Sequence, residues 1–335
     1  MNPIHIGMIG LGRIGLVHYL NVSTMPDVVI DWICDLKADD TYPEQFPAAK
    51  KFTTDYREVL ADPQVEAVLI TASTDVHMEI AKAAALAGKA IFCEKPVGTD
   101  DAEILDVYHV VKETGTLFQT GFNRRYDHNF RRIAEARDAG TLGKGEVLKV
   151  TSRDPEPPNA DYVKISGGIF MDMMIHDFDI VRYISGRDVK TVSVLGAVLV
   201  DPEIGKLGDI DTAIVTLEFE DGMIGVIDNS RRAAYGYDQR IELFGSEGVA
   251  VAGNVHTSTT VVATKDGVVG DVPEHFFLER YREAYRTEIV SFFDKVRNGG
   301  TPECTFEDGI KAIRLAQAAL EALKTGQKVN VKPVE

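Results

Sequence analysis

The chain has 335 residues, of which 44% are hydrophobic, so it is long enough to bury large cores and to form two domains. Its 36 basic and 52 acidic residues give a formal net charge of −16, which disfavours nucleic acid and anionic membranes as partners. Three cysteines, Cys34, Cys93 and Cys304, are too few and too scattered for a disulfide framework or a zinc site. No apolar run reaches the length of a membrane helix, and no targeting segment precedes the first strand, so we expect a cytoplasmic protein.

A glycine-rich loop follows the first apolar run. Residues 5–9 read as a short strand, and Gly10-Leu11-Gly12-Arg13-Ile14-Gly15 leads from it into a helical pattern. This is G-x-G-x-x-G between a strand and a helix, the context in which the motif binds a dinucleotide pyrophosphate at the helix N-terminus. The predicted cofactor-binding residues of this loop are Gly10, Gly12, Arg13, Ile14 and Gly15.

An acidic residue ends the second predicted strand. That strand covers residues 28–34, and Asp35 follows it, twenty positions after Gly15. A carboxylate at this place accepts hydrogen bonds from the adenine ribose and repels the 2′-phosphate of NADP. The sequence therefore predicts NAD as the cofactor, although Lys37 keeps NADP open as an alternative.

Helices and strands then alternate as far as residue 121. Predicted helices at 55–60, 74–87 and 100–114 alternate with predicted strands at 67–71, 90–93 and 117–120. Such alternation indicates a doubly wound parallel sheet of the Rossmann type, which binds ligands at the carboxyl ends of its strands. Thr71, Ser73, Glu94 and Lys95 lie at such ends and join the predicted cofactor site.

Lys95 is the first candidate for chemistry. It follows the strand at 90–93, and an adjacent proline restricts the backbone at this point. A lysine at a strand's carboxyl end faces the crevice in which the nicotinamide is expected. The alternative is a surface lysine in a turn. The Lys95–Pro96 bond also has an appreciable cis option.

The second half of the chain is built differently. A helix at 127–139 and a strand at 145–152 precede a proline-containing loop at 153–165, which is long and polar enough to line a pocket. A series of strands follows. These strands are expected at 189–200, 212–219, 223–230, 239–244, 248–251 and 257–263, with a hairpin at Asp221-Gly222 and closing helices at 276–297 and 306–324. We therefore predict a Rossmann α/β domain at 1–121 and an α+β domain at 122–335 with a large open antiparallel sheet and flanking helices. A second subunit is the natural cover for the open sheet, so we expect a homo-oligomer.

Residues 168–183 stand out within this second half. They read as one helix that is apolar nearly all round, yet Asp172, His176 and Asp179 lie along one face of it. Burying such groups costs several kcal/mol unless they have partners or a function, so this face is predicted to line a cleft. In the alternative, Asp172 serves the helix dipole and His176 is a satisfied core histidine. A less favoured alternative makes the three residues metal ligands.

These motifs together resemble the Gfo/Idh/MocA oxidoreductase family. The resemblance covers the whole chain, from the glycine loop with Asp35, through Glu94-Lys95-Pro96, to the helix that carries Asp172 and His176. Within that family the chain is most similar to bacterial inositol 2-dehydrogenases, on the strength of residues 121–127 (GFNRRYD), 166–183 and 277–293.

The resemblance implies a catalytic triad of Lys95, Asp172 and His176, with no metal. It implies oxidation of myo-inositol at C2 to 2-keto-myo-inositol (scyllo-inosose) by NAD in a homotetramer that pairs through the open sheets. His176 has an intrinsic pKa that suits a general base at neutral pH, Asp172 would orient it, and Lys95 would stabilise the charge on oxygen.

A polyol also needs several hydrogen-bonding partners. Beyond the triad, the predicted substrate-binding residues are Asn123, Arg125, Asp154, Asp179 and Tyr235. Arg125 and Tyr235 are equally compatible with packing or ion-pair roles, and Asp179 with a structural network. The alternative functions are a dehydrogenase for scyllo-inositol or another sugar, and an NAD-binding regulator that has lost catalysis.

Overall fold

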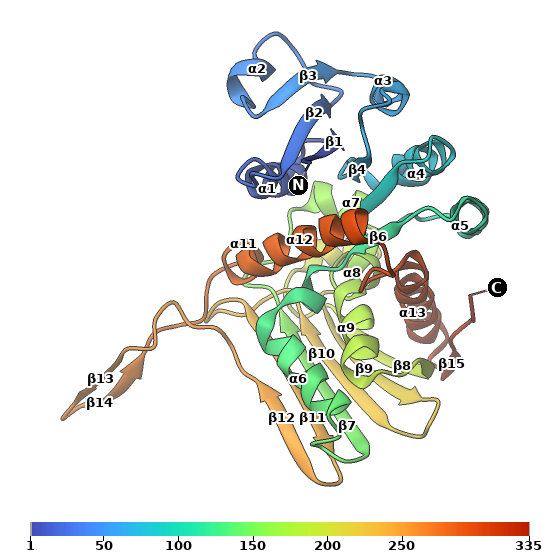
Figure 1. Cartoon of the computed structure of the whole chain (residues 1–335). Helices are drawn as coiled ribbons and strands as arrows, with labels where there is room; N and C mark the ends of the chain where they lie inside the picture. Colours follow the sequence, from blue (N-terminus) through green and yellow to red (C-terminus); the bar gives the residue numbers. More distant parts are fainter. Residues whose placement is uncertain (1, 335) are drawn as a thin grey trace. The chain divides into compact units, whose positions relative to one another are not determined.

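The computed structural model describes residues 2–334, which form two compact units (Figure 1). Among the described residues, the first unit contains 2–123, 284–310 and 334, and the second contains 124–283 and 311–333. A single division after residue 121 does not describe this arrangement, because the chain returns to the first unit at residue 284.

The first unit is built on a six-stranded sheet in which every pairing is parallel, in the order β3-β2-β1-β4-β5-β6. Its strands are β1 (Ile4–Ile9), β2 (Val28–Cys34), β3 (Ala49–Thr53), β4 (Ala67–Ile70), β5 (Ala90–Glu94) and β6 (Phe118–Gly121). The predicted Rossmann sheet is confirmed, with β3 added to it. The strand order reverses between β1 and β4, which is where such sheets open a ligand crevice.

The helices of this unit are α1 (Arg13–Val22), α2 (Tyr42–Gln45), α3 (Tyr56–Ala61), η1 (Thr74–Val76), α4 (His77–Leu86), α5 (Asp101–Thr114) and α12 (Arg282–Asn298). Aspartates begin two of them: Asp55 accepts a hydrogen bond from the Arg57 N–H, and Asp100 accepts one from the Glu103 N–H. Helix α5 ends where Gly115 takes a left-handed φ of 64°, a conformation that glycine adopts without strain.

Helix α12 completes the core of the first unit. Its Ile289, Phe292 and Phe293 are buried in one apolar cluster with Met8 of β1 and Phe92 of β5. Each fully buried side chain of this size stabilises the unit by roughly 2 kcal/mol. This packing explains why a segment so late in the sequence belongs to the first unit.

The second unit is built on a seven-stranded sheet in the order β12-β11-β7-β10-β9-β8-β15. Its strands are β7 (Gly145–Arg153), β8 (Val189–Ala197), β9 (Thr212–Phe219), β10 (Ile224–Ser230), β11 (Asp238–Gly245), β12 (Gly248–Ala252) and β15 (Val329–Asn330). The predicted hairpin at Asp221-Gly222 is confirmed between β9 and β10, with Gly222 at φ 89°. The sheet is mixed, because β7 and β10 pair in parallel while its other neighbours are antiparallel.

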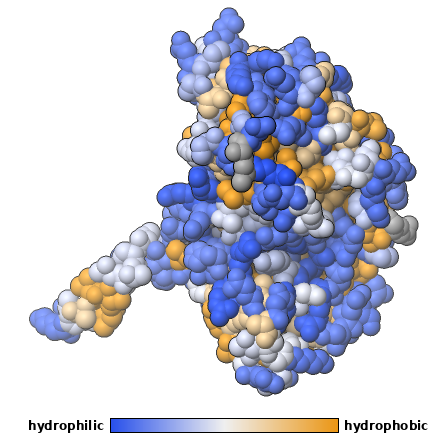
Figure 2. All heavy atoms as spheres, in the orientation of Figure 1, coloured by the Kyte–Doolittle hydropathy of each residue, from blue (hydrophilic) through white to orange (hydrophobic). Residues whose placement is uncertain are grey.

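Helices accompany this sheet, and one hairpin extends away from it (Figure 1). The helices are α6 (His128–Asp138), α7 (Ala160–Ile165), α8 (Gly168–Asp172), α9 (Ile175–Ser185), α10 (Pro202–Lys206), α11 (Phe277–Arg280) and α13 (Phe306–Thr325), and η2 (Asn123–Tyr126) precedes α6. Helix α9 contacts both α6 and β7. Strands β13 (Val261–Thr264) and β14 (Gly267–Gly270) form the hairpin, whose valines lie at the surface (Figure 2).

The predicted single helix at 168–183 is wrong: two helices, α8 and α9, occupy this region. The N–H groups of Met173 and Met174 both donate to the carbonyl oxygen of Ile169, at 3.1 and 2.8 Å. One carbonyl therefore serves two donors, which widens the turn and interrupts the regular helix. Asp172 ends α8, and His176 lies in the first turn of α9.

Two other predicted boundaries are also wrong. Strand β8 stops at Ala197 rather than 200, because the buried carboxylate of Asp211 accepts the N–H groups of the next residues, 199–201, and turns the chain. The predicted helix at 276–297 is divided at Tyr281 into α11 and α12. Within residues 2–334, no helix combines the length and the apolar character that crossing a membrane requires.

Candidate active site

The glycine loop lies in the crevice of the first sheet. Gly10 follows β1 with a φ of 94°, and a Cβ there would come within 2.5 Å of the Ala72 backbone. A Cβ on Gly15 would come within 2.3 Å of the Gly10 carbonyl oxygen. Glycine is therefore required at both positions for α1 to pack against the ends of β1 and β4.

The N-terminus of α1 is suited to a pyrophosphate. Gly12 caps the helix without a side-chain hydrogen bond, and no acidic residue lies in the first turn. A Cβ on Gly12 would meet no atom within 4 Å, so the backbone here faces open space. The first N–H groups of α1 can thus donate hydrogen bonds to an anion, such as the pyrophosphate of a dinucleotide cofactor.

Asp35 ties the loop to the end of β2. Its carboxylate accepts the N–H of Leu11 at 2.6 Å and the N–H of Lys37 at 2.8 Å. The residue is half-buried, and a carboxylate has lone pairs left for a ribose after two such bonds. Its predicted contact with the adenine ribose fits this geometry.

Thr71 and Ser73 follow β4 on the other side of the crevice. The Thr71 hydroxyl donates to the Gly10 carbonyl oxygen at 2.5 Å, so this side chain helps to hold the glycine loop in place. Ser73 is exposed and precedes η1. Their predicted contacts with the cofactor remain predictions, as do those of Arg13 and Ile14.

Lys95 begins directly after β5 and is half-buried. The Lys95–Pro96 bond is cis, the option that the sequence left open. The Lys95 N–H donates to the Glu94 carboxylate at 3.1 Å, and a ring nitrogen of His77 lies 3.0 Å from the Pro96 carbonyl oxygen. Burial lowers the pKa of His77, which favours its neutral form. The backbone around Lys95 is therefore held on both sides.

In the second unit, Asp172 and His176 are partly exposed, whereas residues 173–175 between them are buried. The Asp172 carboxylate accepts the Tyr162 hydroxyl at 2.8 Å and pairs with Arg231 at 3.4 Å. Arg231 is itself only 1% exposed, so its charge acts on Asp172 with little screening by water. These two contacts hold the Asp172 carboxylate in a defined position.

Asp154 follows β7 in the same unit. Its N–H donates to the Ser230 carbonyl, which holds the residue beside the end of β10. Burial raises the pKa of the Asp154 carboxyl to about 7, with the charge of Arg231 opposing this shift and that of Asp172 adding to it. At neutral pH this group can both donate and accept a hydrogen bond.

Three other predicted substrate residues make contacts within the protein. Arg125 and Asp179 form a buried bidentate ion pair with distances of 2.8 and 2.6 Å, which is the structural role that the sequence left open for them. The Tyr235 hydroxyl bonds to Asp238 and Arg153, although the residue is 44% exposed. The pairing of Asp179 with Arg125 argues against the metal alternative.

Asn123 differs from these three. It is 2% exposed, and its side-chain Nδ2 has no hydrogen-bond partner among the described residues. A buried amide donor of this kind costs free energy unless a partner arrives. Asn123 is therefore a strong candidate for contact with a ligand.

The sequence did not identify Tyr162, Arg231 or His18 as functional candidates. Tyr162 lies in the 153–165 loop that was predicted to line a pocket, so a signal existed for it. Arg231 follows directly after β10. A charged residue at the end of a strand is only a weak sign of a functional role. His18 lies in α1 with no sequence neighbour that reveals its partner, Glu94.

Known proteins resemble the chain over its whole length. The profile of an oxidoreductase family with an NAD-binding Rossmann fold matches residues 4–122, and the profile of the same family's C-terminal alpha/beta domain matches residues 138–331. A myo-inositol 2-dehydrogenase of Thermotoga maritima is 46% identical over 99% of both chains. A scyllo-inositol 2-dehydrogenase (NAD(+)) of Bacillus subtilis is 35% identical over 98% of this chain and 97% of the relative.

A solved structure also corresponds closely. The crystal structure of scyllo-inositol dehydrogenase from Lactobacillus casei with bound NAD(H) and scyllo-inositol superposes with a TM-score of 0.91 at 28% identity, covering 98% of this chain and 99% of that one. The predicted fold, the family and the NAD cofactor are thus confirmed. The chain belongs to the Gfo/Idh/MocA oxidoreductase family, and its first unit is an NAD-binding Rossmann domain.

Proposed function

We propose that the chain oxidises myo-inositol at C2 to 2-keto-myo-inositol, with NAD as the acceptor of the hydride. The observation that carries the proposal is the pair of Asp172 and His176, which are partly exposed whereas the helix residues between them are buried, with Tyr162 and Arg231 in contact with Asp172. The choice of myo-inositol rests on the relatives, since the identity to the myo-inositol enzyme is 46% and that to the scyllo-inositol enzyme is 35%.

His176 is the general base of the proposed reaction. Oxidation of a secondary alcohol requires loss of the hydroxyl proton as hydride leaves the carbon, and an imidazole is suited to accept that proton near neutral pH. Asp172 orients the imidazole and stabilises the imidazolium that forms. Tyr162 and Arg231 hold the Asp172 carboxylate in place, which favours a fixed orientation of the imidazole during proton transfer.

Lys95 stabilises the oxygen of the reacting hydroxyl. Its ammonium group supplies hydrogen-bond donors and a positive charge where negative charge develops on that oxygen. Its backbone is held by Glu94 and His77, which favours a defined position for the side chain. Bound NAD supplies the acceptor for the hydride.

Asn123 and Asp154 are proposed to bind the other hydroxyl groups of the ring. Asn123 offers a buried amide donor without a partner in the described residues. Asp154, with a pKa of about 7, can act as donor or acceptor. Arg125, Asp179 and Tyr235 are proposed to support the site through their ion pairs and hydrogen bonds rather than as primary ligands.

The substrate is tested by NADH formation from a panel of polyols. Purified protein should give its highest kcat/KM with myo-inositol and NAD, and lower values with scyllo-inositol, D-chiro-inositol, glucose, xylose or NADP. A preference for scyllo-inositol would keep the mechanism and reassign the substrate. Absence of turnover across the panel, with NAD still bound, would contradict the proposal.

The catalytic roles are tested by His176→Ala and Lys95→Ala. Each variant should lose about 10²- to 10⁴-fold in kcat, because a proton acceptor or a charge stabiliser is removed, while NAD affinity changes little. His109→Ala is the matched control, since His109 is an exposed histidine outside the site. Near-native turnover of either site variant would disprove its assigned role.

We also propose that the protein forms a homotetramer in which the open faces of the seven-stranded sheets pair. The outward side chains of this sheet include Leu195, Ile214, Ile224, Phe244 and Val251, which are 38–78% exposed. A patch of this kind is typical of a subunit interface. Ile224→Asp with Phe244→Asp should yield a smaller species in analytical ultracentrifugation, whereas Leu86→Asp on α4 should not.

A further inference from the structure

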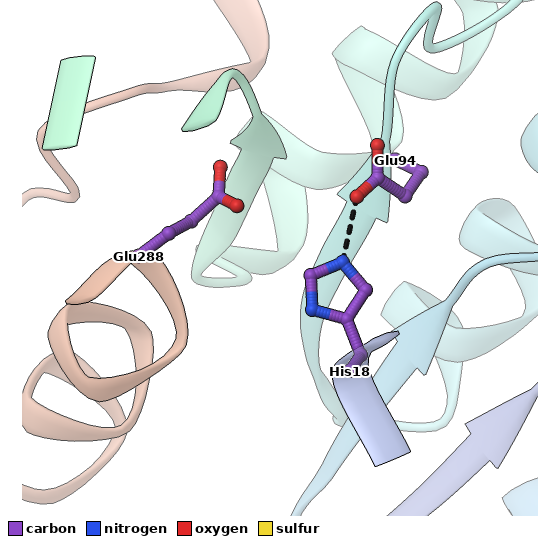
Figure 3. A group of neighbouring side chains, drawn as sticks. All are labelled: His18, Glu94 and Glu288. Atoms are coloured by element: carbon purple, nitrogen blue, oxygen red, sulfur yellow. Dashed lines mark hydrogen bonds and ion pairs between the residues drawn. The ribbon is translucent and has the colours of Figure 1, made fainter. Parts of the chain in front are cut away.

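Three buried ionisable side chains meet inside the first unit (Figure 3). His18 comes from α1, Glu94 from the end of β5 and Glu288 from α12. His18 and Glu288 are 0% exposed and Glu94 is 7% exposed. Burying such groups is costly, so their arrangement needs a physical reason.

The Glu94 carboxylate uses both of its oxygens within the protein. Oε1 lies 2.6 Å from His18 Nε2, which is hydrogen-bonding distance. Oε2 accepts the N–H of Lys95 at 3.1 Å. A continuous chain of hydrogen bonds therefore runs from α1 through His18 and Glu94 to the backbone of Lys95.

Packing fixes this chain of bonds in place. The His18 ring makes edge contacts with Phe92 and Tyr285, at centroid distances of 5.0 and 5.9 Å. A Cβ on Gly121 would lie 3.0 Å from the Glu94 carboxyl carbon, so the carboxylate packs directly on a glycine backbone. The imidazole and the carboxylate therefore both pack closely against neighbouring groups.

The same contacts argue against a cation at this place. The cluster offers one ligand atom from each residue within 4.8 Å of the others, which is a separation that a metal ion can bridge. Nε2 of His18 and both Glu94 oxygens, however, are already hydrogen-bonded to each other and to the Lys95 N–H. The geometry instead serves to hold the segment that follows β5.

We propose that His18 and Glu94 are positioning residues for Lys95, and we call this pair the Glu94 brace. The brace links α1, whose N-terminus is suited to the cofactor pyrophosphate, to the segment that carries the lysine. It thereby fixes the position of Lys95 relative to α1. This inference rests on the catalytic role proposed for Lys95.

The proposal predicts how variants of His18 affect turnover. His18→Leu removes the donor to Glu94 and should lower kcat about 10- to 100-fold, with NAD affinity nearly unchanged, because a misplacement of about 1 Å costs this much. His18→Gln keeps an amide nitrogen near the position of Nε2 and should recover most of the loss. Ile33→Val, a change in the core of the same sheet, controls for general loss of stability and should leave kcat unaffected.

A double-mutant cycle separates positioning from general damage. If the brace acts only through Lys95, His18→Leu in a Lys95→Ala background should lower kcat by no more than about twofold further. A full additional 10- to 100-fold loss in that background would overturn the proposal. Equal kcat for His18→Leu and His18→Gln would overturn it as well.

A second readout does not depend on the substrate. Reductive methylation with ¹³C introduces an NMR signal at Lys95, which the Lys95→Arg variant identifies by its absence. In the NAD complex, His18→Leu should shift or broaden this signal and His18→Gln should restore it. An unchanged signal in His18→Leu would overturn the brace even if no polyol is oxidised, so failure of the proposed function and failure of the brace are told apart.

Discussion

Four buried carboxylates, three in the second unit and one in the first, have different kinds of partner. In the second unit, buried aspartates face buried arginines in the pairs Arg124–Asp177, Arg125–Asp179 and Arg280–Asp127. In the first unit, the buried Glu94 faces His18. Arginine can bind a carboxylate through two N–H groups of a planar guanidinium, whereas histidine offers one ring nitrogen. The three carboxylates of the second unit are therefore held by guanidinium groups, and Glu94 of the first unit is held by an imidazole.

This difference matters for the site because the arginine pairs fasten the helix that carries His176. Arg124 and Arg125 are consecutive in η2, and both bind aspartates of α9. Asp177 also accepts the Asn229 side-chain amide from β10 at 2.8 Å. Helix α9 is thus tied to two neighbouring elements by charge-assisted bonds, which limits its movement when substrate or proton charges change.

The largest predicted effect comes from breaking such a pair. Arg124→Met leaves Asp177 buried without its counter-ion, so the free energy of unfolding should fall by about 3–5 kcal/mol. Urea denaturation of the protein with NAD bound measures this loss. The kcat should fall in parallel, because α9, which carries His176, loses its ion pair with Arg124.

A second substitution distinguishes charge from packing in this experiment. Adding Asp177→Asn to Arg124→Met removes the uncompensated charge and should recover a large part of the lost stability. Lys206→Ala, which breaks the exposed Lys206–Glu203 pair, should cause no measurable loss. A cost below about 1 kcal/mol for Arg124→Met alone would show that the buried pair does not hold the unit together.

The contrast also explains what the sequence could predict. The glycine loop, Asp35 and Lys95 could be proposed from the sequence because their signals are local: each follows a strand at a fixed spacing, at the carboxyl edge of the sheet. Asp172 and His176 could be proposed because charged residues are conspicuous in an apolar segment.

The partners of these residues were not predictable in the same way. Glu94 and His18 are separated by 76 positions in the sequence, and Asp172 and Arg231 by 59. No rule based on residue spacing therefore predicts either contact. The break between α8 and α9 occurs where the Ile169 carbonyl oxygen accepts hydrogen bonds from two N–H groups. The pattern of hydrophobic residues does not predict such an arrangement. The parallel pairing of β7 with β10 likewise depends on tertiary topology rather than on local alternation.

A pH-dependent effect is expected from Asp154, a carboxyl group of the second unit whose pKa is shifted. Its pKa is raised from 3.8 to about 7, so the folded state binds a proton more tightly than the unfolded state does. Stability is therefore lost as pH rises from about 4 to about 7, by at most about 1.4 kcal/mol per pH unit. Asp154→Asn should remove this dependence.

Urea denaturation of the wild type and the Asp154→Asn variant at several pH values between 4 and 8 tests the sign, since other groups contribute equally to both proteins. The variant should gain stability relative to the wild type as pH rises. A constant difference across this range would mean that Asp154 titrates normally and that the second unit holds no strained carboxyl here.

The smallest effect should be the same in both units, because helix caps use only local bonds. Asp100 caps α5 in the first unit through the Glu103 N–H at 2.9 Å, and Asp201 caps α10 in the second through the Glu203 N–H at 2.9 Å. Replacing either aspartate by alanine should cost about 1 kcal/mol in urea denaturation. Equal costs would place the difference between the units in their buried charges alone. If Asp201→Ala cost several kcal/mol more than Asp100→Ala, the second unit would also depend on its surface turns, and the contrast drawn from arginine and histidine would be incomplete.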